Sequence, residues 1–188
     1  MKIAAALLAV CAWSAPSMAR AGLSLGVDAG PNFVTTDIDG LEAVGIEDVG
    51  IAVAGRIGFA FDLGPVVVIP EARLAFEDAG TPDAFRGMGG LRIRLGTVFT
   101  PVVFGYAGGL VGDIEGFTWD VGGGFDFLVS PSFALGLYAS YNRAENPPEF
   151  VNDASFLDDL MELPVLPGLP ERWEWIQVGL SASFDVGI

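Results

Sequence analysis

The feature that most constrains the fold is an alternation of period two in which one of the two registers holds no charged residue. Apolar residues recur at alternate positions, with small or polar residues between them, in eight successive segments. Residues two apart in a strand point to the same face of a sheet. The pattern therefore predicts eight β-strands that each have one uncharged face. The segments are 23–29, 51–61, 68–76, 91–99, 102–110, 117–127, 133–141 and 176–188.

The other register of these segments carries the charges, mixed with many Gly and Ala. A soluble β-protein turns its polar residues outwards, whereas a membrane barrel turns its apolar residues towards lipid. A charge facing lipid at mid-bilayer would cost ~2–4 kcal/mol, so we expect the charges to face the lumen. The sequence predicts an all-β fold, an eight-stranded antiparallel transmembrane up-and-down β-barrel. The expected lumen charges are Asp28, Arg56, Glu71, Arg73, Arg92, Arg94, Asp120, Asp126 and Asp185.

Two sets of bulky residues are expected on the lipid side of this barrel. The uncharged register of the fifth segment contains the first set, and the second set suits the aromatic belt at the membrane–water interface. These residues are Val102, Phe104, Tyr106 and Leu110 in the fifth segment, and Trp173 and Trp175 before the eighth.

The connections between segments alternate in length. Short links with turn-forming residues are expected at 62–65, 97–101 and 130–132. The opposite links are mostly longer and acidic, at 35–49, 77–89, 112–116 and 142–172. Short periplasmic turns and longer external loops are typical of bacterial outer-membrane barrels. We therefore expect this location, with both termini in the periplasm.

The N-terminus has the pattern of a secretory signal peptide. Lys2 precedes an uncharged run, and small residues at Ala19 and Ala21 suit cleavage after Ala21. The run is shorter than the ~20 residues that a membrane-spanning helix needs. We predict a signal peptide at 1–21 and a barrel at 22–188. The net charge of −15 for the whole chain repels phosphate backbones, so nucleic acid is excluded as a partner.

The last segment resembles the end of known outer-membrane barrels. Its polar Gln177, Gly179 and hydrophobic Phe184 are similar to the terminal signal that the barrel-assembly machinery reads, although the chain ends on Ile188 where that family commonly has Phe. With the strand pattern, this resembles the small eight-stranded barrels of the OmpA transmembrane and OmpX type. The resemblance implies a membrane barrel inserted by that machinery, with Gln177, Gly179, Phe184 and Ile188 as assembly signal.

The lumen charges allow two interpretations. An eight-stranded barrel is just wide enough to be filled by its own side chains, and unpaired charges inside it would be costly. A plug of ion pairs is therefore favoured over a gated ion path. Enzymatic activity is not expected, because the chain has no histidine to serve as a base near neutral pH. No cofactor is expected.

Two loop features complete the sequence evidence. Asp37, Asp39 and Glu42 offer oxygen ligands for a metal, but the full calcium-loop pattern is absent, and an acidic turn is favoured. Residues 142–172 contain apolar residues at roughly helical spacing, which suit either a helix over the barrel mouth or contact with a surface partner. Lipid and lipopolysaccharide are the other expected partners.

We expect a monomer with a structural or surface-interaction role, such as envelope integrity or adhesion, through its acidic external loops. A narrow channel for small solutes or ions is the first alternative. A secreted, soluble, lipocalin-like ligand binder is the second.

Overall fold

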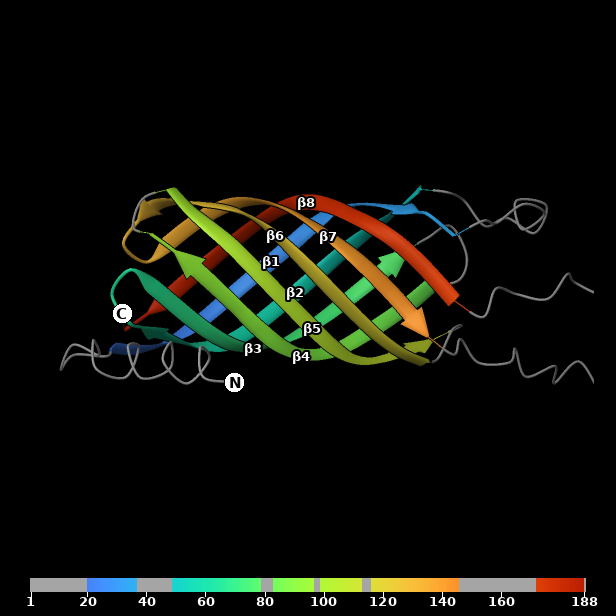
Figure 1. Ribbon diagram of the computed structural model, residues 1–188, viewed down its shortest axis with the longest axis horizontal. Helices are drawn as coiled ribbons and strands as arrows, with labels where there is room; N and C mark the ends of the chain where they lie inside the picture. Colours follow the sequence, from blue (N-terminus) through green and yellow to red (C-terminus); the bar gives the residue numbers. More distant parts are fainter. Residues whose placement is uncertain are drawn as a thin grey trace, which may run out of the picture.

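The computed structural model describes residues 20–36, 49–78, 83–96, 99–112, 116–145 and 172–187, which form a closed antiparallel barrel of eight strands (Figure 1). Each strand pairs with its neighbours in the sequence, and β8 closes the barrel on β1. The predicted eight-stranded antiparallel barrel is confirmed. The strands are β1 (Arg20–Val34), β2 (Val49–Asp62), β3 (Val66–Asp78), β4 (Asp83–Leu95), β5 (Phe99–Gly112), β6 (Gly116–Ser130), β7 (Phe133–Glu145) and β8 (Arg172–Val186).

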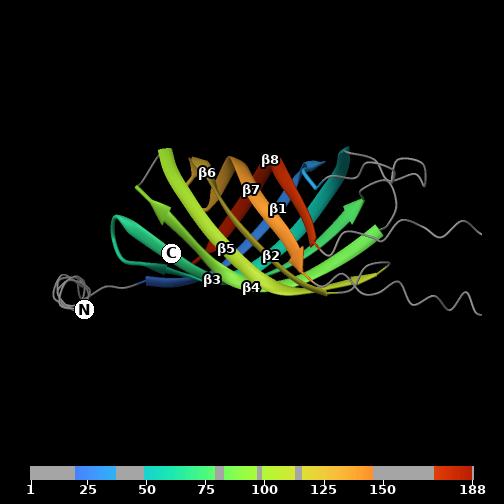
Figure 2. The same ribbon diagram turned by 45° about the vertical axis from the view of Figure 1, so that its right-hand side comes forward.

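The strands run obliquely around the barrel, whose two ends differ (Figures 1 and 2). The start of β1 and the end of β8 lie at one end, together with the links 63–65, 96–98 and 131–132; we call this the turn end. The links 35–48, 79–82, 113–115 and 146–171 belong to the other end, called the loop end, and lie mostly outside the described residues. The two long links, 35–48 and 146–171, are thus both at the loop end, whereas every turn-end link is short.

Two predicted boundaries were wrong. The link expected at 77–89 is reduced to 79–82, because β3 continues to Asp78 and β4 begins at Asp83. The alternation continues through Phe76 and Phe85, whose ring centroids are 5.0 Å apart. Glycines in the apolar register of β4 interrupt the pattern of bulky residues, so the sequence analysis ended the strand too early. Phe99 opens β5 instead of ending the fourth segment.

The outer face of the barrel is apolar and its interior is polar. Ile57 on β2 is 54% exposed and Leu180 on β8 is 65% exposed, and similar bulky residues cover the other strands. Outward-facing charges of the described side chains lie only near strand ends, for example Arg143 and Arg172. An apolar outer face of this kind is stable in lipid and unfavourable in water. The arrangement is that of a transmembrane barrel and excludes the soluble, lipocalin-like alternative.

The fifth strand reverses the predicted register. Its apolar and aromatic residues are buried in the lumen, whereas Val103, which is 51% exposed, faces outwards with Val111 and small residues between them. Neither register of this strand holds a charge, so side-chain size was the only basis for assigning its two faces. In this strand the larger side chains fill the interior. The inward-facing residues are Val102, Phe104, Tyr106 and Leu110.

The aromatic-belt prediction was also wrong. Trp173 and Trp175 point inwards at the loop end and pack with Ala84 on β4, Leu110 on β5 and Ala144 on β7. Strand β8 begins at Arg172, so its alternation extends back from Gln177 without interruption and puts both rings on the lumen side. The outward aromatic pairs at this end include Trp119 with Tyr141, whose ring centroids are 5.6 Å apart, and Phe76 with Phe85.

Candidate functional site

The lumen holds a dense set of charged side chains. All nine charges expected there from the sequence are buried inside the barrel, together with Glu77 and Arg86, which the sequence analysis had assigned to a loop. The described lumen thus contains five arginines and six carboxylates. Glu77 continues the alternation of Glu71 and Arg73, and Arg86 that of Arg92, so continuing the period-two pattern would have found both.

The two signs of charge are distributed unevenly around the wall. The five arginines come from three adjacent strands, β2, β3 and β4, whereas β6, β8 and β1 contribute only carboxylates. Arginines therefore reach across the barrel to carboxylates on the opposite wall, as well as to Glu71 and Glu77 on β3. A lumen built in this way is tied together across its width.

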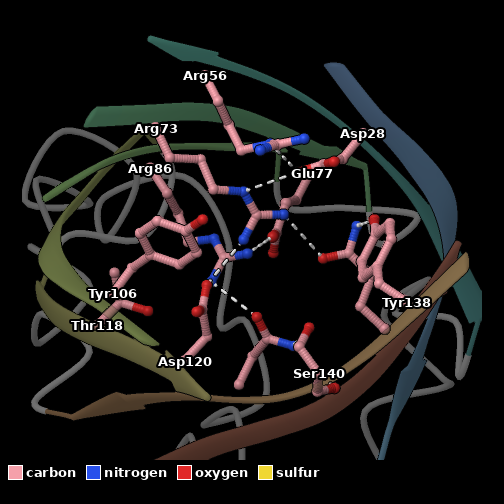
Figure 3. A network of polar contacts seen from close by, with 12 residues as sticks. Asp28, Arg56, Arg73, Glu77, Arg86, Tyr106, Thr118, Asp120, Tyr138 and Ser140 are labelled. Atoms are coloured by element: carbon pink, nitrogen blue, oxygen red, sulfur yellow. Dashed lines mark hydrogen bonds and ion pairs between the residues drawn. The ribbon is translucent and has the colours of Figure 1, made fainter. Parts of the chain in front are cut away.

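Arg73 lies at the centre of this arrangement and is 1% exposed (Figure 3). Its Nη1 atom is 2.8 Å from Oδ2 of Asp120 on β6, and its Nε atom is 3.6 Å from Oδ2 of Asp28 on β1. Its Nη2 atom donates a hydrogen bond of 3.3 Å to Gln177, whose amide donates in turn to the Tyr138 hydroxyl at 2.7 Å. One guanidinium thus connects three other strands directly.

A second group of ion pairs joins this centre through Asp28. Arg56 on β2 lies 2.9 Å from Asp28 and 3.3 Å from Glu71. Glu71 also pairs with Arg92 at 3.1 Å and accepts a hydrogen bond from the Tyr106 hydroxyl. Charge-assisted bonds of this kind are stronger than neutral ones, so Glu71 holds β2, β4 and β5 against β3.

A third group lies towards the loop end. Arg86 forms an ion pair with Glu77, donates a 3.1 Å hydrogen bond to Asn142 on β7, and lies 3.8 Å from Asp120 (Figure 3). Its guanidinium carbon lies 5.0 Å from the centre of the Trp175 ring, within the range of a cation–π contact. The apolar cluster around Trp175 therefore covers the loop-end side of the network.

Together these contacts form one connected network with members from all eight strands. We call it the lumen network, and it contains Asp28, Arg56, Glu71, Arg73, Glu77, Arg86, Arg92, Tyr106, Asp120, Tyr138, Asn142 and Gln177. A second apolar cluster, which includes Phe104 and Tyr138, packs beside it. The arrangement holds the wall together and fills the interior with interlocked side chains.

Three predicted lumen charges lie outside this network, near the turn end. Arg94 on β4 forms a separate ion pair of 2.5 Å with Asp185 on β8. Asp126 on β6 has only a weak contact, 3.5 Å from its Oδ1 atom to the Ser181 hydroxyl. The structure thus brings six of the nine predicted charges into one network and keeps these three apart.

The predicted assembly signal is divided between the two faces. Gln177 is buried as a member of the lumen network, and Phe184 faces outwards. Gly179 leaves room for the Tyr138 ring, since a Cβ there would fall 2.8 Å from its hydroxyl oxygen. Ile188 lies outside the described residues, and recognition by the assembly machinery stays a prediction.

The metal candidates Asp37, Asp39 and Glu42, and residues 146–171 of the predicted partner-binding loop, also lie outside the described residues. In the described ranges, no three or more acidic or thiol side chains are grouped closely enough to bind a metal ion. Nor do these ranges contain a helix long and apolar enough to cross a membrane.

A known outer-membrane protein has a similar barrel fold, although no sequence relative matches the chain. No protein-family model matches the chain, and no curated protein is similar to it in sequence. The crystal structure of Neisserial surface protein A (NspA) is similar at a TM-score of 0.51 and 10% identity, covering 85% of this chain and 95% of that one. A designed transmembrane β-barrel gives a TM-score of 0.43 at 11% identity, over 88% and 95% of the two chains. The designed barrel TMB2.3 gives 0.38 at 17%, over 92% and 100%. The likeness to NspA, at such low identity, establishes a shared barrel fold alone.

Proposed function

We propose that the protein is a bacterial outer-membrane barrel with a structural or surface-interaction role, that its lumen is closed to ions, and that its acidic loop-end connections carry the interactions. The observation that carries this proposal is the lumen network, which draws side chains from every strand into the interior. With the lumen occupied in this way, contact with other molecules falls to the ends of the barrel and to its outer wall.

Closure follows from the energetics of the network. An ion that crosses the lumen must displace arginines such as Arg73 and Arg86 from their carboxylates. Separating one partner of a buried pair leaves an uncompensated charge, at a cost of ~3–5 kcal/mol. Arg73 has two carboxylate partners and a glutamine, so several contacts would have to break together. The network therefore favours a plug over the alternative of a narrow channel.

The purified protein should be electrically silent in planar lipid bilayers. We expect no discrete conductance steps in concentrated KCl, because an ion would have to separate the buried pairs around Arg73 to pass. A general porin reconstituted in the same way serves as positive control. Reproducible steps that disappear after heat denaturation of the protein would contradict the closed lumen and favour the channel.

The charge of the chain supports the assignment of the loop end to the cell exterior. Acidic residues outnumber basic ones by 24 to 9, and the links that follow β1 and β7 are rich in Asp and Glu. Such loops can bind lipopolysaccharide phosphates through bridging divalent cations, and residues 142–172 offer apolar side chains to a surface partner. We place both termini in the periplasm and propose a monomer. The absence of histidine from the chain supports a non-enzymatic role.

Epitope tags test this orientation. A tag inserted between β7 and β8, within 146–171, should bind antibody on intact cells. The same tag at Pro131 in the turn between β6 and β7 should bind only after the outer membrane is permeabilised. Labelling of both tags, or of the turn-end tag alone, on intact cells would overturn the proposed orientation.

A further inference from the structure

The charges of the described lumen do not balance, and the imbalance is localised at Asp126. Five of the six lumen carboxylates form an ion pair with at least one arginine. Asp126 has no arginine partner among the described residues. The arginines of β4 that lie in the turn-end half, Arg92 and Arg94, pair with Glu71 and Asp185. Asp126 is therefore the one carboxylate of the described lumen without an arginine at ion-pair distance, although Arg92 lies close enough for its charge to act on it.

Two hydroxyl groups lie beside Asp126, and one of them has no hydrogen-bond partner among the described residues. It is 3% exposed, and its Oδ2 atom accepts no hydrogen bond. Thr100 stands directly opposite on β5, faces the same interior, is 2% exposed, and has a hydroxyl without a partner. The Ser181 hydroxyl on β8 lies 3.5 Å from Oδ1 of Asp126. These groups present one carboxylate and two hydroxyls to a common region.

A glycine keeps this region open. Gly136 on β7 lies between Asp126 and Ser181 in the hydrogen-bonding ladder, paired with one on each side. A Cβ atom at this position would fall 2.5 Å from the Ser181 Oγ atom and directly against Oδ1 of Asp126. Any larger residue at 136 would therefore occupy the space between the two oxygen-bearing side chains.

A buried ionised carboxylate is costly unless an opposite charge pairs directly with it and its oxygens are hydrogen-bonded or coordinated. Carboxylate and hydroxyl oxygens are ligands for hard cations, and divalent sites generally use several carboxylates, whereas this one has a single negative charge. We propose that Asp126, Thr100 and Ser181 bind one monovalent hard cation, such as Na⁺, inside the turn-end half of the lumen. The site does not depend on the proposed role, because a bound ion neutralises the interior of a closed barrel or of an open one.

Thermal unfolding of the detergent-solubilised protein tests the site. NaCl is compared with choline chloride at equal ionic strength, since oxygen ligands do not coordinate the methylated nitrogen of choline as they coordinate a hard cation. The melting temperature should rise saturably with Na⁺, by about 5–10 °C at one hundred times the dissociation constant. Broadening of the ²³Na resonance by the folded protein gives an independent measure.

Three variants complete the test. Asp126→Asn removes the charge and should abolish the difference between Na⁺ and choline. Gly136→Ala keeps the carboxylate but fills the space, and should abolish both this difference and the ²³Na broadening. Ser183→Ala, on the same strand as Ser181 and also buried, should retain both.

Equal melting temperatures of the wild type in the two salts would overturn the proposal. So would a Na⁺ effect that persists in both Asp126→Asn and Gly136→Ala, or a stabilisation produced by Ca²⁺ and not by Na⁺. If Asp126→Asn does not fold, the ²³Na resonance of Gly136→Ala against wild type decides, and equal broadening rejects the site.

Discussion

Asp120→Ala should lower the free energy of unfolding by about 3–5 kcal/mol, because it removes a carboxylate that compensates two buried arginines. Asp120 lies 2.8 Å from Arg73 and 3.8 Å from Arg86, and all three side chains are almost completely buried. Arg73 would keep Asp28 at 3.6 Å, and Arg86 would keep Glu77. Neither remaining contact replaces the 2.8 Å pair across the lumen.

The measurement is urea-induced unfolding in lipid vesicles, followed by tryptophan fluorescence. The matched control is the double variant Asp120→Ala with Arg73→Met, which removes the stranded charge together with its partner. We expect the double variant to lose less free energy of unfolding than Asp120→Ala and Arg73→Met lose in total. The difference should be about 0.5–3 kcal/mol, the range for residues in one network. A loss below about 1 kcal/mol in Asp120→Ala would mean that water, and not the ion pairs, compensates these charges.

Much of the fold could be predicted from the sequence because charge marks one register so clearly. In β2, β3 and β4 the arginines fix the inward side, and in β8 the alternation is long and regular. Strand β5 has no charge in either register, so the sequence offered only bulk, and the lumen takes its bulky side chains. In β8, the alternation continued back from Gln177 puts Trp173 and Trp175 on the lumen side.

Six of the eight charged members of the lumen network could be predicted from the sequence, but their pairings could not. Arg73 and Asp120 belong to strands that are not neighbours, and they meet only because the barrel closes and its strands tilt. Which residues face each other across a lumen depends on strand number and stagger, which alternation does not specify. Gln177 illustrates the limit: its position suggests an assembly signal, whereas its side chain links Arg73 to Tyr138.

The other large effect concerns the outer wall. Ile57→Arg should cost about 2–4 kcal/mol, because it places a charge on the lipid face near the middle of β2. Ile57 is 54% exposed on the outside of the barrel, and its ladder neighbours Leu25 and Ala72 offer it no counter-charge. An arginine there would have to remain in hydrocarbon or bend the chain towards the headgroups. We expect a reduced folded fraction, seen as loss of the heat-modifiable band on gels after reconstitution.

Depth along one strand provides the control for this result. Phe61 lies on the same face of β2, four residues closer to the turn end and near the edge of the apolar outer surface. A basic residue at this depth costs about 0–1 kcal/mol, so Phe61→Arg should have a small effect. Ile57→Ala measures the loss of the side chain without the charge. Because Ile57 faces outwards, we expect Ile57→Arg to reduce the folded fraction clearly more than either Phe61→Arg or Ile57→Ala. Equal effects of Ile57→Arg and Phe61→Arg would mean that the middle of β2 does not face hydrocarbon, because only a lipid environment makes the cost of a charge depend on its depth.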